Sequence, residues 1–368
     1  MTVPRRRIWT IATAGLCAVL VAACGSSAKH SSSSTHSGSS TTGSSGSSLA
    51  SAKQLVGAGS TLVAPLMSQW EPTYDQKYGV AVTYGAIGSG GGIESITGRS
   101  VTFGASDAPL TPQQAAACKG CLEIPWALAA TDVAYHVQGV PNNLKLTGPV
   151  LAKIWMGQIT SWNDPAIARL NPGVKLPATK IVPVHRTDGS GDTFAFTNYL
   201  SHVDPAFKSK IGVATTVNWP GGVGGKGNSG VGGVLQSTNG AIAYIAIAYV
   251  LENKFDYALV QNAAGRYPTP GIASISAAAR AATTVPKGGT QGISLVDPPA
   301  SAAGAYPIST FTYVIVPKRS SSPAVAGALR KFIGWAITAG QADGPKLDFA
   351  PLPAAVVSAD KATLAELR

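Results

Sequence analysis

The sequence predicts an α/β protein with a largely parallel sheet and two domains. From residue 51 onward, short runs rich in β-branched and aromatic residues alternate with segments of helical periodicity, as in strands joined by crossover helices. Three turns rich in Gly, Ser and Thr stand where such strands give way to helices. The alternating part has about 315 residues, a length that favours two domains over one.

Composition narrows the class of protein further. Hydrophobic residues make up 45% of the 368 residues, which excludes a chain disordered throughout, and only 12% are charged, which excludes a coiled coil. The formal net charge is +11, but outside the cluster of Arg5, Arg6 and Arg7 the basic residues are scattered and form no basic helix or stripe. We therefore expect no nucleic-acid partner.

The first element is an export signal in residues 1–23. The arginine cluster precedes an apolar run over residues 8–23 that ends in small residues before Cys24. The run is marginal in length for a bilayer span, so a retained transmembrane helix is the weaker interpretation. Small residues directly before a cysteine resemble the bacterial lipoprotein signal, in which Cys24 becomes the acylated N-terminus and anchors the protein to a membrane.

A tether follows the signal in residues 24–52. After Cys24 it consists almost entirely of Ser, Gly, Thr and Ala, and such a segment cannot bury enough apolar surface to repay its ordering entropy. Its two histidines, His30 and His36, are interpreted as inert rather than metal-binding.

Cys118 and Cys121 form the C-x-x-C pair of the exported part. A local disulfide is the favoured interpretation, because a zinc site would need two more ligands and the remaining histidines lack metal-binding spacing. A redox-active pair is the alternative, but the pair lies in an expected loop after a helix start rather than opening a helix after a strand.

The α/β part contains segments with the character of strands and two helices with recognisable starts. The expected strands are residues 80–84, 101–104, 181–185, 241–249 and 308–316. Thr111, Pro112 and Gln114 form a capping box with proline at the first helical position. Ser322 and Pro323 open a second helix, expected to run through Trp335 and to stop at Gly340.

The three Gly-rich turns are candidate anion-binding segments. They cover residues 57–61, 85–92 and 188–193, and each precedes a segment of helical character. Glycines let consecutive N–H groups face a ligand at a helix N-terminus, where the helix dipole favours negative charge, and Ser and Thr hydroxyls add neutral donors. A single turn of this kind is more often structural, but three in one chain indicate a site for a small oxyanion.

Known nucleotide and hydrolase motifs do not explain these turns. Neither the P-loop pattern nor the dinucleotide fingerprint is present in its proper context, so we do not expect a nucleotide. Gly189, Ser190 and Gly191 lack the spacing of a nucleophile elbow, and no histidine is placed to complete a convincing triad. A secreted phosphatase or esterase with Ser190 or Asp107 as nucleophile is therefore the weaker alternative.

Charged residues near the turns refine the ligand. Arg186 precedes the third turn and can present a planar fork to two oxygens of a tetrahedral anion, with Asp188 as a partner that holds the guanidinium. A surface ion pair is the competing interpretation. Asp107 follows an expected strand, and its alternatives are an anion-site carboxylate or an Asx turn or N-cap.

At these residues the chain resembles the phosphate-binding lipoproteins of the bacterial high-affinity phosphate ABC transporter. The resemblance rests on co-linear motifs between about residue 53 and the Pro-Leu-Pro at 351–353. The tract 185–194 is most similar to actinobacterial members. The matching motifs are residues 57–61, 87–92, 103–110, 154–165, 186–191 and 225–228.

The resemblance implies a type II periplasmic-binding-protein fold, with two α/β lobes and a ligand cleft between them. Lobe one is expected to comprise residues 53–127 plus 302–368, and lobe two residues 128–301. The implied phosphate site takes N–H groups and hydroxyls from its turns, together with one guanidinium and a carboxylate. Its residues are Thr61, Leu62, Ser89, Asp107, Arg186, Ser190, Gly191 and Asp192, with Asp188 in support.

Two positions within this site bear on selectivity, and a third differs from the family without such an effect. The Asp107 carboxylate repels a fully ionised anion. Phosphate near neutral pH carries a proton that can be donated to this carboxylate, whereas sulfate does not. Asp192 stands where many relatives have Thr; it either faces the anion, favouring H₂PO₄⁻, or caps the following helix. Leu62 stands where many relatives have an aromatic residue, which matters little if only its N–H is used.

The function implied is that of a non-enzymatic receptor on the outer face of the cell membrane. It closes on inorganic phosphate by a hinge and delivers it to permease subunits powered by a cytoplasmic ATPase. We expect a monomer that uses no cofactor and no metal. Receptors for sulfate, molybdate or a phosphonate are the alternatives within the fold, and Asp107 argues against fully ionised anions. The tether also permits an adhesin or antigen role, which no sequence feature requires.

Overall fold

The computed structural model of the chain describes residues 53–282 and 294–368. The expected signal in residues 1–23, the lipidation candidate Cys24 and the tether up to residue 52 lie outside the described residues. Among the described helices, none combines the length and the apolar character needed to cross a bilayer.

Nine of the described strands form one sheet, and two others pair separately. The strands are β1 (Gln54–Gly59), β2 (Ala81–Ala86), β3 (Phe103–Ser106), β4 (Cys121–His136), β5 (Lys145–Leu146), β6 (Val182–Arg186), β7 (Val223–Gly225), β8 (Ala241–Ala246), β9 (Asp256–Tyr257), β10 (Leu259–Val260) and β11 (Ser309–Pro317). The large sheet has the order β2-β1-β3-β11-β4-β8-β6-β7, with β9 also paired to β4, and β10 pairs with β5.

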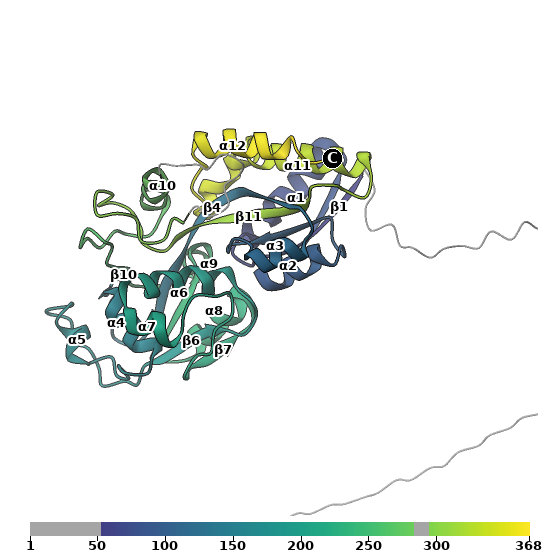
Figure 1. The fold of residues 1–368 in the computed structure, drawn as a ribbon. Helices are drawn as coiled ribbons and strands as arrows, with labels where there is room; N and C mark the ends of the chain where they lie inside the picture. The colour runs from purple at the N-terminus through teal and green to yellow at the C-terminus, as the bar shows by residue number, and fades with distance from the viewer. Residues whose placement is uncertain (1–52, 283–293) are drawn as a thin grey trace, which may run out of the picture. The chain divides into compact units, whose positions relative to one another are not determined.

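Helices connect and cover these strands (Figure 1). They are α1 (Ala64–Tyr78), α2 (Ser89–Thr97), α3 (Pro112–Ala117), α4 (Gly148–Trp155), α5 (Pro165–Ala168), α6 (Gly191–Val203), α7 (Pro205–Lys210), α8 (Gly227–Ser237), α9 (Ile247–Glu252), α10 (Ile272–Ala281), α11 (Pro323–Ala336), the 3₁₀-helix η1 (Ala339–Leu347) and α12 (Ala354–Leu364).

The sheet is mixed, which corrects the prediction that it is largely parallel. Strand β1 runs parallel to β2 and β3, and β6 runs parallel to β7 and β8. In the centre, however, β11 is antiparallel to β3 and β4, and β4 is antiparallel to β8. Both central strands are almost wholly buried. A continuous apolar run of this kind reveals burial but not strand direction.

Strand β4 divides the sheet into two halves. Its residues 121–130 pair with β11, and its residues 131–136 pair with β8. We call β2, β1, β3 and β11 the first sheet half, and β8, β6, β7 and β9 the second sheet half. One long strand therefore contributes to both halves, so side chains on β4 can reach segments that belong to either.

Aromatic residues fill the core beside the first sheet half. Trp70 on α1 packs edge-on against Trp126 on β4 with ring centroids 5.4 Å apart, and against Trp335 on α11 at 6.0 Å. Such edge-to-face contacts are a favourable arrangement of aromatic rings. Helix α1 near the beginning of the described chain and α11 near its end therefore lie together, as Figure 1 shows.

Several predicted elements agree with the structure. Thr111 caps α3 through a complete capping box with Gln114, and Ser322 caps α11 by accepting a hydrogen bond from the Val325 N–H. The strand expected over residues 241–249 is too long, because β8 ends at Ala246 and α9 begins at the next residue. The β-branched and aromatic residues of α9 favour a strand by their intrinsic propensity. They form a helix because tertiary packing overrides that propensity.

Candidate functional site

The predicted turns lie at the carboxyl ends of parallel strands. The turn of residues 57–61 leads from β1 toward α1, and that of residues 85–92 joins β2 to α2. The third, residues 188–193, joins β6 to α6 in the second sheet half. Open sheets of this kind bind ligands at the carboxyl ends of their strands.

Two hydrogen bonds bring the turns of the two sheet halves together. The Gly191 N–H donates to Ser89 Oγ over 3.1 Å, although the residues are far apart in the sequence. The side-chain amide of Asn228, at the start of α8, donates to Thr61 Oγ1 over 2.9 Å. The predicted residues Thr61, Ser89 and Gly191 are all buried, so these contacts form the interior of one site.

Asp107 lies at the centre of the contacts on the first-half side. Its carboxylate accepts hydrogen bonds from Ser60 Oγ at 2.6 and 2.7 Å and from Thr312 Oγ1 at 2.7 Å, and Ser89 Oγ lies 3.4 Å away. The side chain therefore makes long-range contacts, and the Asx-turn interpretation is wrong. Burial, followed by the charge of Asp192, raises the pKa of Asp107 to about 7.

Arg186 lies at the end of β6 between two carboxylates. Its Nε donates to Asp188 Oδ1 over 2.8 Å, as the sequence predicts, and its Nη1 donates to Asp192 Oδ2 over 2.9 Å. The side chain of Arg186 is only 1% exposed, so a surface ion pair does not describe it. Asp188 is also fixed by the Gly227 N–H, which donates to its Oδ1.

Asp192 faces the buried site rather than capping a helix. The cap of α6 is Ser190, whose side chain accepts from the Thr193 N–H. Asp192 accepts instead from Thr131 Oγ1 at 2.8 Å and from Asn228 Nδ2 at 2.9 Å, in addition to Arg186. Burial raises the pKa of Asp192, although the charge of Arg186 opposes the shift.

Some predicted donors are used within the protein in this structure. The resemblance implies that the Ser190 N–H faces an anion, but in the structure this N–H donates to the Thr215 carbonyl over 2.8 Å. The Leu62 N–H donates to Ser60 Oγ over 3.0 Å. Ser190 has 0% exposure and can contribute its hydroxyl, but its N–H is not aimed at the remaining site residues.

Four residues of this network are not among those that the sequence predicts. Asn228 connects Thr61 to Asp192, and its Oδ1 accepts from the Ala246 N–H over 2.9 Å. The other three are Ser60, Thr131 and Thr312. The motif of residues 225–228 and the first turn already contained Asn228 and Ser60, but nothing local in sequence indicates which carboxylate a buried hydroxyl or amide will meet.

The Cys118–Cys121 pair is a disulfide, and it lies apart from this network. Cys118 ends α3 and Cys121 begins β4. Arg99, after the end of α2, donates to the Cys118 carbonyl over 2.8 Å and to the Ile96 carbonyl over 3.0 Å. Arg99 thus links the disulfide to the C-terminal end of α2, whereas Ser89 lies at the N-terminal end of that helix. This place indicates that the disulfide stabilises the fold and does not contact the site.

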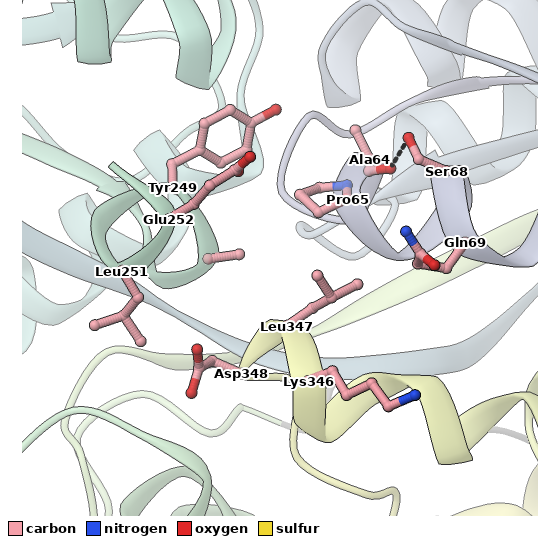
Figure 2. A pocket seen from close by; sticks show the side chains of 11 residues that line it. Ala64, Pro65, Ser68, Gln69, Tyr249, Leu251, Glu252, Lys346, Leu347 and Asp348 are labelled. Atoms are coloured by element: carbon pink, nitrogen blue, oxygen red, sulfur yellow. Dashed lines mark hydrogen bonds between the residues drawn. The ribbon is translucent and has the colours of Figure 1, made fainter. Parts of the chain in front are cut away.

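A cavity of about 640 Å³ lies between α1, α9 and η1, beside the first turn of α1. Figure 2 shows Tyr249 and Glu252 on one side, Pro65 and Gln69 on the other, and Leu347 between them. None of the predicted site residues lines this cavity. A smaller cavity of about 170 Å³ does reach Asp107, and Phe194 and Phe311 are among its lining residues.

The site can offer both donors and acceptors to an anion. One guanidinium and several hydroxyls face two carboxylates with raised pKa values, an arrangement suited to a tetrahedral anion that carries a proton. Within residues 53–282 and 294–368, His, Cys, Asp and Glu side chains form no group of three that could hold a metal ion.

Comparisons with known proteins give a consistent result. The matching family model, over residues 35–339, describes a PBP superfamily domain. The chain is 41% identical over 301 residues to the phosphate-binding protein PstS of Xylella fastidiosa (strain Temecula1), with 82% of each chain covered. It is 36% identical over 307 residues to the phosphate-binding protein PstS of Pasteurella multocida (strain Pm70), covering 83% of this chain and 88% of that protein.

A likeness in fold extends to solved structures. The phosphate-binding protein from Stenotrophomonas maltophilia matches with a TM-score of 0.66 and 19% identity, over 84% of this chain and 93% of that chain. At this identity the likeness concerns the fold alone.

Proposed function

Because the chain belongs to the family of PstS phosphate-binding proteins, we propose that it is an extracytoplasmic receptor that binds inorganic phosphate for an ABC transporter. Its fold is the α/β fold of the periplasmic binding proteins, as the sequence predicts. Relatives of this family carry names that refer to binding rather than catalysis. The receptor leaves transport to membrane permease subunits.

The observation that carries the proposal is the meeting of donor turns from both sheet halves around Asp107 and Arg186. Gly191 and Ser89 are in hydrogen-bond contact, and so are Thr61 and Asn228. We assign phosphate to this place, with Thr61, Leu62, Ser89, Ser190 and Gly191 as neutral donors. Binding then requires the Leu62 and Gly191 N–H groups to exchange their present acceptors for phosphate oxygens.

Asp107 makes the site selective for an anion that has a proton to donate. A phosphate O–H donating to the carboxylate removes the repulsion between two negative groups, whereas sulfate leaves the buried acceptor facing bare oxygens. An unsatisfied buried acceptor costs about 1–3 kcal/mol, and more if it is charged. The raised pKa of Asp107 fits this use, because such a carboxyl can hold or accept a proton near neutral pH.

The two sheet halves support the proposal of two lobes, residues 53–127 plus 302–368 and residues 128–301. Strands β4 and β11 run side by side at the junction and offer two crossing segments for a hinge. We propose that phosphate draws the lobes together and that the closed form docks on the permease. Acylation of Cys24 would hold the receptor, as a monomer, at the outer face of the membrane, and mass spectrometry of the mature N-terminus tests this.

Calorimetry of the purified protein tests the function directly. The protein is unfolded and refolded to remove any bound anion, and then titrated with phosphate, sulfate and arsenate. We expect one phosphate per chain and much weaker binding of sulfate. Tighter binding of sulfate would favour the alternative oxyanion receptor, and catalytic turnover of an aryl phosphate monoester would contradict a non-enzymatic role.

A further inference from the structure

Two backbones meet at a pair of glycines where the sheet halves adjoin. The Gly90 N–H, in the first turn of α2, donates to the Gly189 carbonyl over 2.9 Å. Gly90 belongs to the segment between β2 and β3, whereas Gly189 lies between β6 and α6. The contact therefore joins the same two turns that the hydrogen bond from Gly191 to Ser89 joins.

These backbones approach so closely that even a methyl group at either glycine would make a tight contact with the other. A Cβ on Gly90 would lie 3.1 Å from the Gly189 Cα, and a Cβ on Gly189 would lie 3.0 Å from the Gly90 Cα. Neither glycine adopts a positive φ, so backbone conformation does not require glycine at either position. The close approach of the two turns is the feature that requires it.

Each glycine adjoins a predicted phosphate donor. Ser89 precedes Gly90, and Ser190 follows Gly189. Any side chain at either glycine has to push the turns apart by a few tenths of an ångström, and the donors move with them. The separation of the Ser89 and Ser190 groups is therefore fixed by a backbone contact that itself need not touch an anion.

We propose that Gly90 and Gly189 are positioning residues that set the gap between the two donor turns and so fit the site to an anion of the size of phosphate. This inference rests on the proposed function and adds to it what determines the size of anion that the site accepts. A smaller or larger gap would change the preference among tetrahedral oxyanions, not only the affinity.

Gly91 provides a matched control on the same helix. The three heavy atoms nearest to a Cβ on Gly91 all belong to the Ile87 side chain, and the nearest of them is Cδ1 at 2.9 Å. Ile87 is 43% exposed, so it can rotate into solvent. Gly90→Ala and Gly91→Ala thus make the same change of helix propensity one residue apart, and only the first adds a methyl group between the sheet halves.

The test measures phosphate and arsenate affinity by calorimetry for the wild type, Gly90→Ala, Gly189→Ala and Gly91→Ala. We expect Gly90→Ala and Gly189→Ala each to weaken phosphate binding by about tenfold. Arsenate has longer bonds to oxygen and should lose less, so the phosphate-to-arsenate ratio falls. Gly91→Ala should leave both affinities within about twofold of the wild type. Thermal melting of the ligand-free proteins checks that each variant folds. If Gly90→Ala does not fold, the phosphate and arsenate affinities of Gly189→Ala decide the test.

The outcomes separate this inference from the proposed function. A wild-type protein that binds no phosphate overturns both. Phosphate binding by the wild type together with unchanged affinities in Gly90→Ala and Gly189→Ala overturns the inference alone. Equal losses for phosphate and arsenate also overturn it, because a structural defect lowers both affinities while a widened gap changes their ratio.

Discussion

Arg186 donates from Nη1 to Asp192 Oδ2 over 2.9 Å, and both side chains are only 1% exposed. The same guanidinium donates from Nε to Asp188. One positive charge is thus shared by two carboxylates, with Asp107 as a third acid whose pKa the charge of Asp192 helps to raise. The site has little positive charge left for a dianion, and this balance favours a ligand that brings its own protons.

Asp192→Asn should therefore shift the preference from H₂PO₄⁻ toward HPO₄²⁻. The amide keeps a hydrogen-bond acceptor for Arg186 but removes one negative charge from the site. We expect wild-type affinity to rise as the pH falls through the second pKa of phosphate, near 7 by analogy with about 6 for phosphoesters. The variant should show a smaller rise. Calorimetry at pH 6 and pH 8.5 measures the ratio of affinities.

Asp164→Asn is the matched control for net charge. Asp164 caps α5 by accepting from the Ala166 N–H over 2.7 Å, and it makes no contact with the site network. Its variant should keep the wild-type ratio between the two pH values. The same ratio in Asp192→Asn as in the wild type would contradict a direct effect of Asp192 on the anion.

Asp107→Asn should relax discrimination between phosphate and sulfate. The amide can donate to a sulfate oxygen, so the penalty of about 1–3 kcal/mol for an unsatisfied buried acceptor disappears, and selectivity falls by about 5- to 150-fold. Asp132→Asn is the control, because Asp132 is equally buried on β4 and its pKa is also raised by burial to about 7. Asp132 Oδ1 accepts from the Tyr306 hydroxyl and the Val133 N–H, and neither of these residues belongs to the network. Titration of each variant with both anions measures the ratio, and an unchanged ratio in Asp107→Asn would refute the role.

The two helix caps at Thr111 and Ser322 could be predicted from the sequence, but the strand pairing at the centre of the sheet could not. Thr111 and Ser322 mark the starts of their helices because their side chains accept hydrogen bonds from backbone N–H groups three residues later. Such caps depend only on neighbours in the sequence. The long strand β4 pairs with β11 and β8 from distant parts of the chain. Its direction relative to them depends on tertiary pairing, about which a uniformly apolar segment carries no local information.

Asn228→Ala should weaken both the site and the fold. The side chain has 0% exposure, and truncation leaves the Ala246 N–H without its acceptor and Asp192 without one donor. We expect a loss of about 1–3 kcal/mol in the free energy of unfolding, together with weaker phosphate binding. Thermal melting and calorimetry measure the two effects.

Asn171→Ala is the matched control for Asn228→Ala. Asn171 is 7% exposed, and its side chain bridges the Lys145 backbone and the Ile167 carbonyl. Its truncation should cost stability while leaving phosphate affinity unchanged. Equal losses of affinity in the two variants would show that Asn228 acts only through overall stability.

The site residues, like the central strands, could be predicted only where local sequence carries the information. Arg186 and Asp107 are identified by residue type and by position beside the turns, and Asp192 is identified by the family resemblance. In the structure Arg186 donates to Asp192, and Ser89 connects Asp107 to Gly191 in the same turn as Asp192. Thr312 lies more than two hundred residues from Asp107 in sequence, yet it donates to that carboxylate over 2.7 Å. A threonine in an apolar strand gives no local sign of such a partner, since the contact is created by the pairing of β11 with β3.

Asp360 on α12 should make the ligand-free protein less stable as the pH rises. It is 1% exposed, neither carboxylate oxygen has a hydrogen-bond partner among the described residues, and burial raises its pKa to about 8. In the unfolded chain its pKa is about 3.9. Between these two values the folded state holds a proton that the unfolded state has lost. The free energy of unfolding therefore falls by about 1.4 kcal/mol per pH unit in this window.

Asp360→Asn should flatten this dependence between pH 4 and pH 8, because the amide does not titrate. Asp75→Asn, which changes an exposed residue of α1, is the control and should keep the wild-type slope. Urea denaturation at a series of pH values measures the free energy of unfolding of each protein. Other buried acids with raised pKa values, such as Asp132, add to the wild-type slope, so the informative quantity is the difference between the wild type and Asp360→Asn. A difference that stays constant from pH 4 to pH 8 would mean that Asp360 keeps an ordinary pKa in the folded protein.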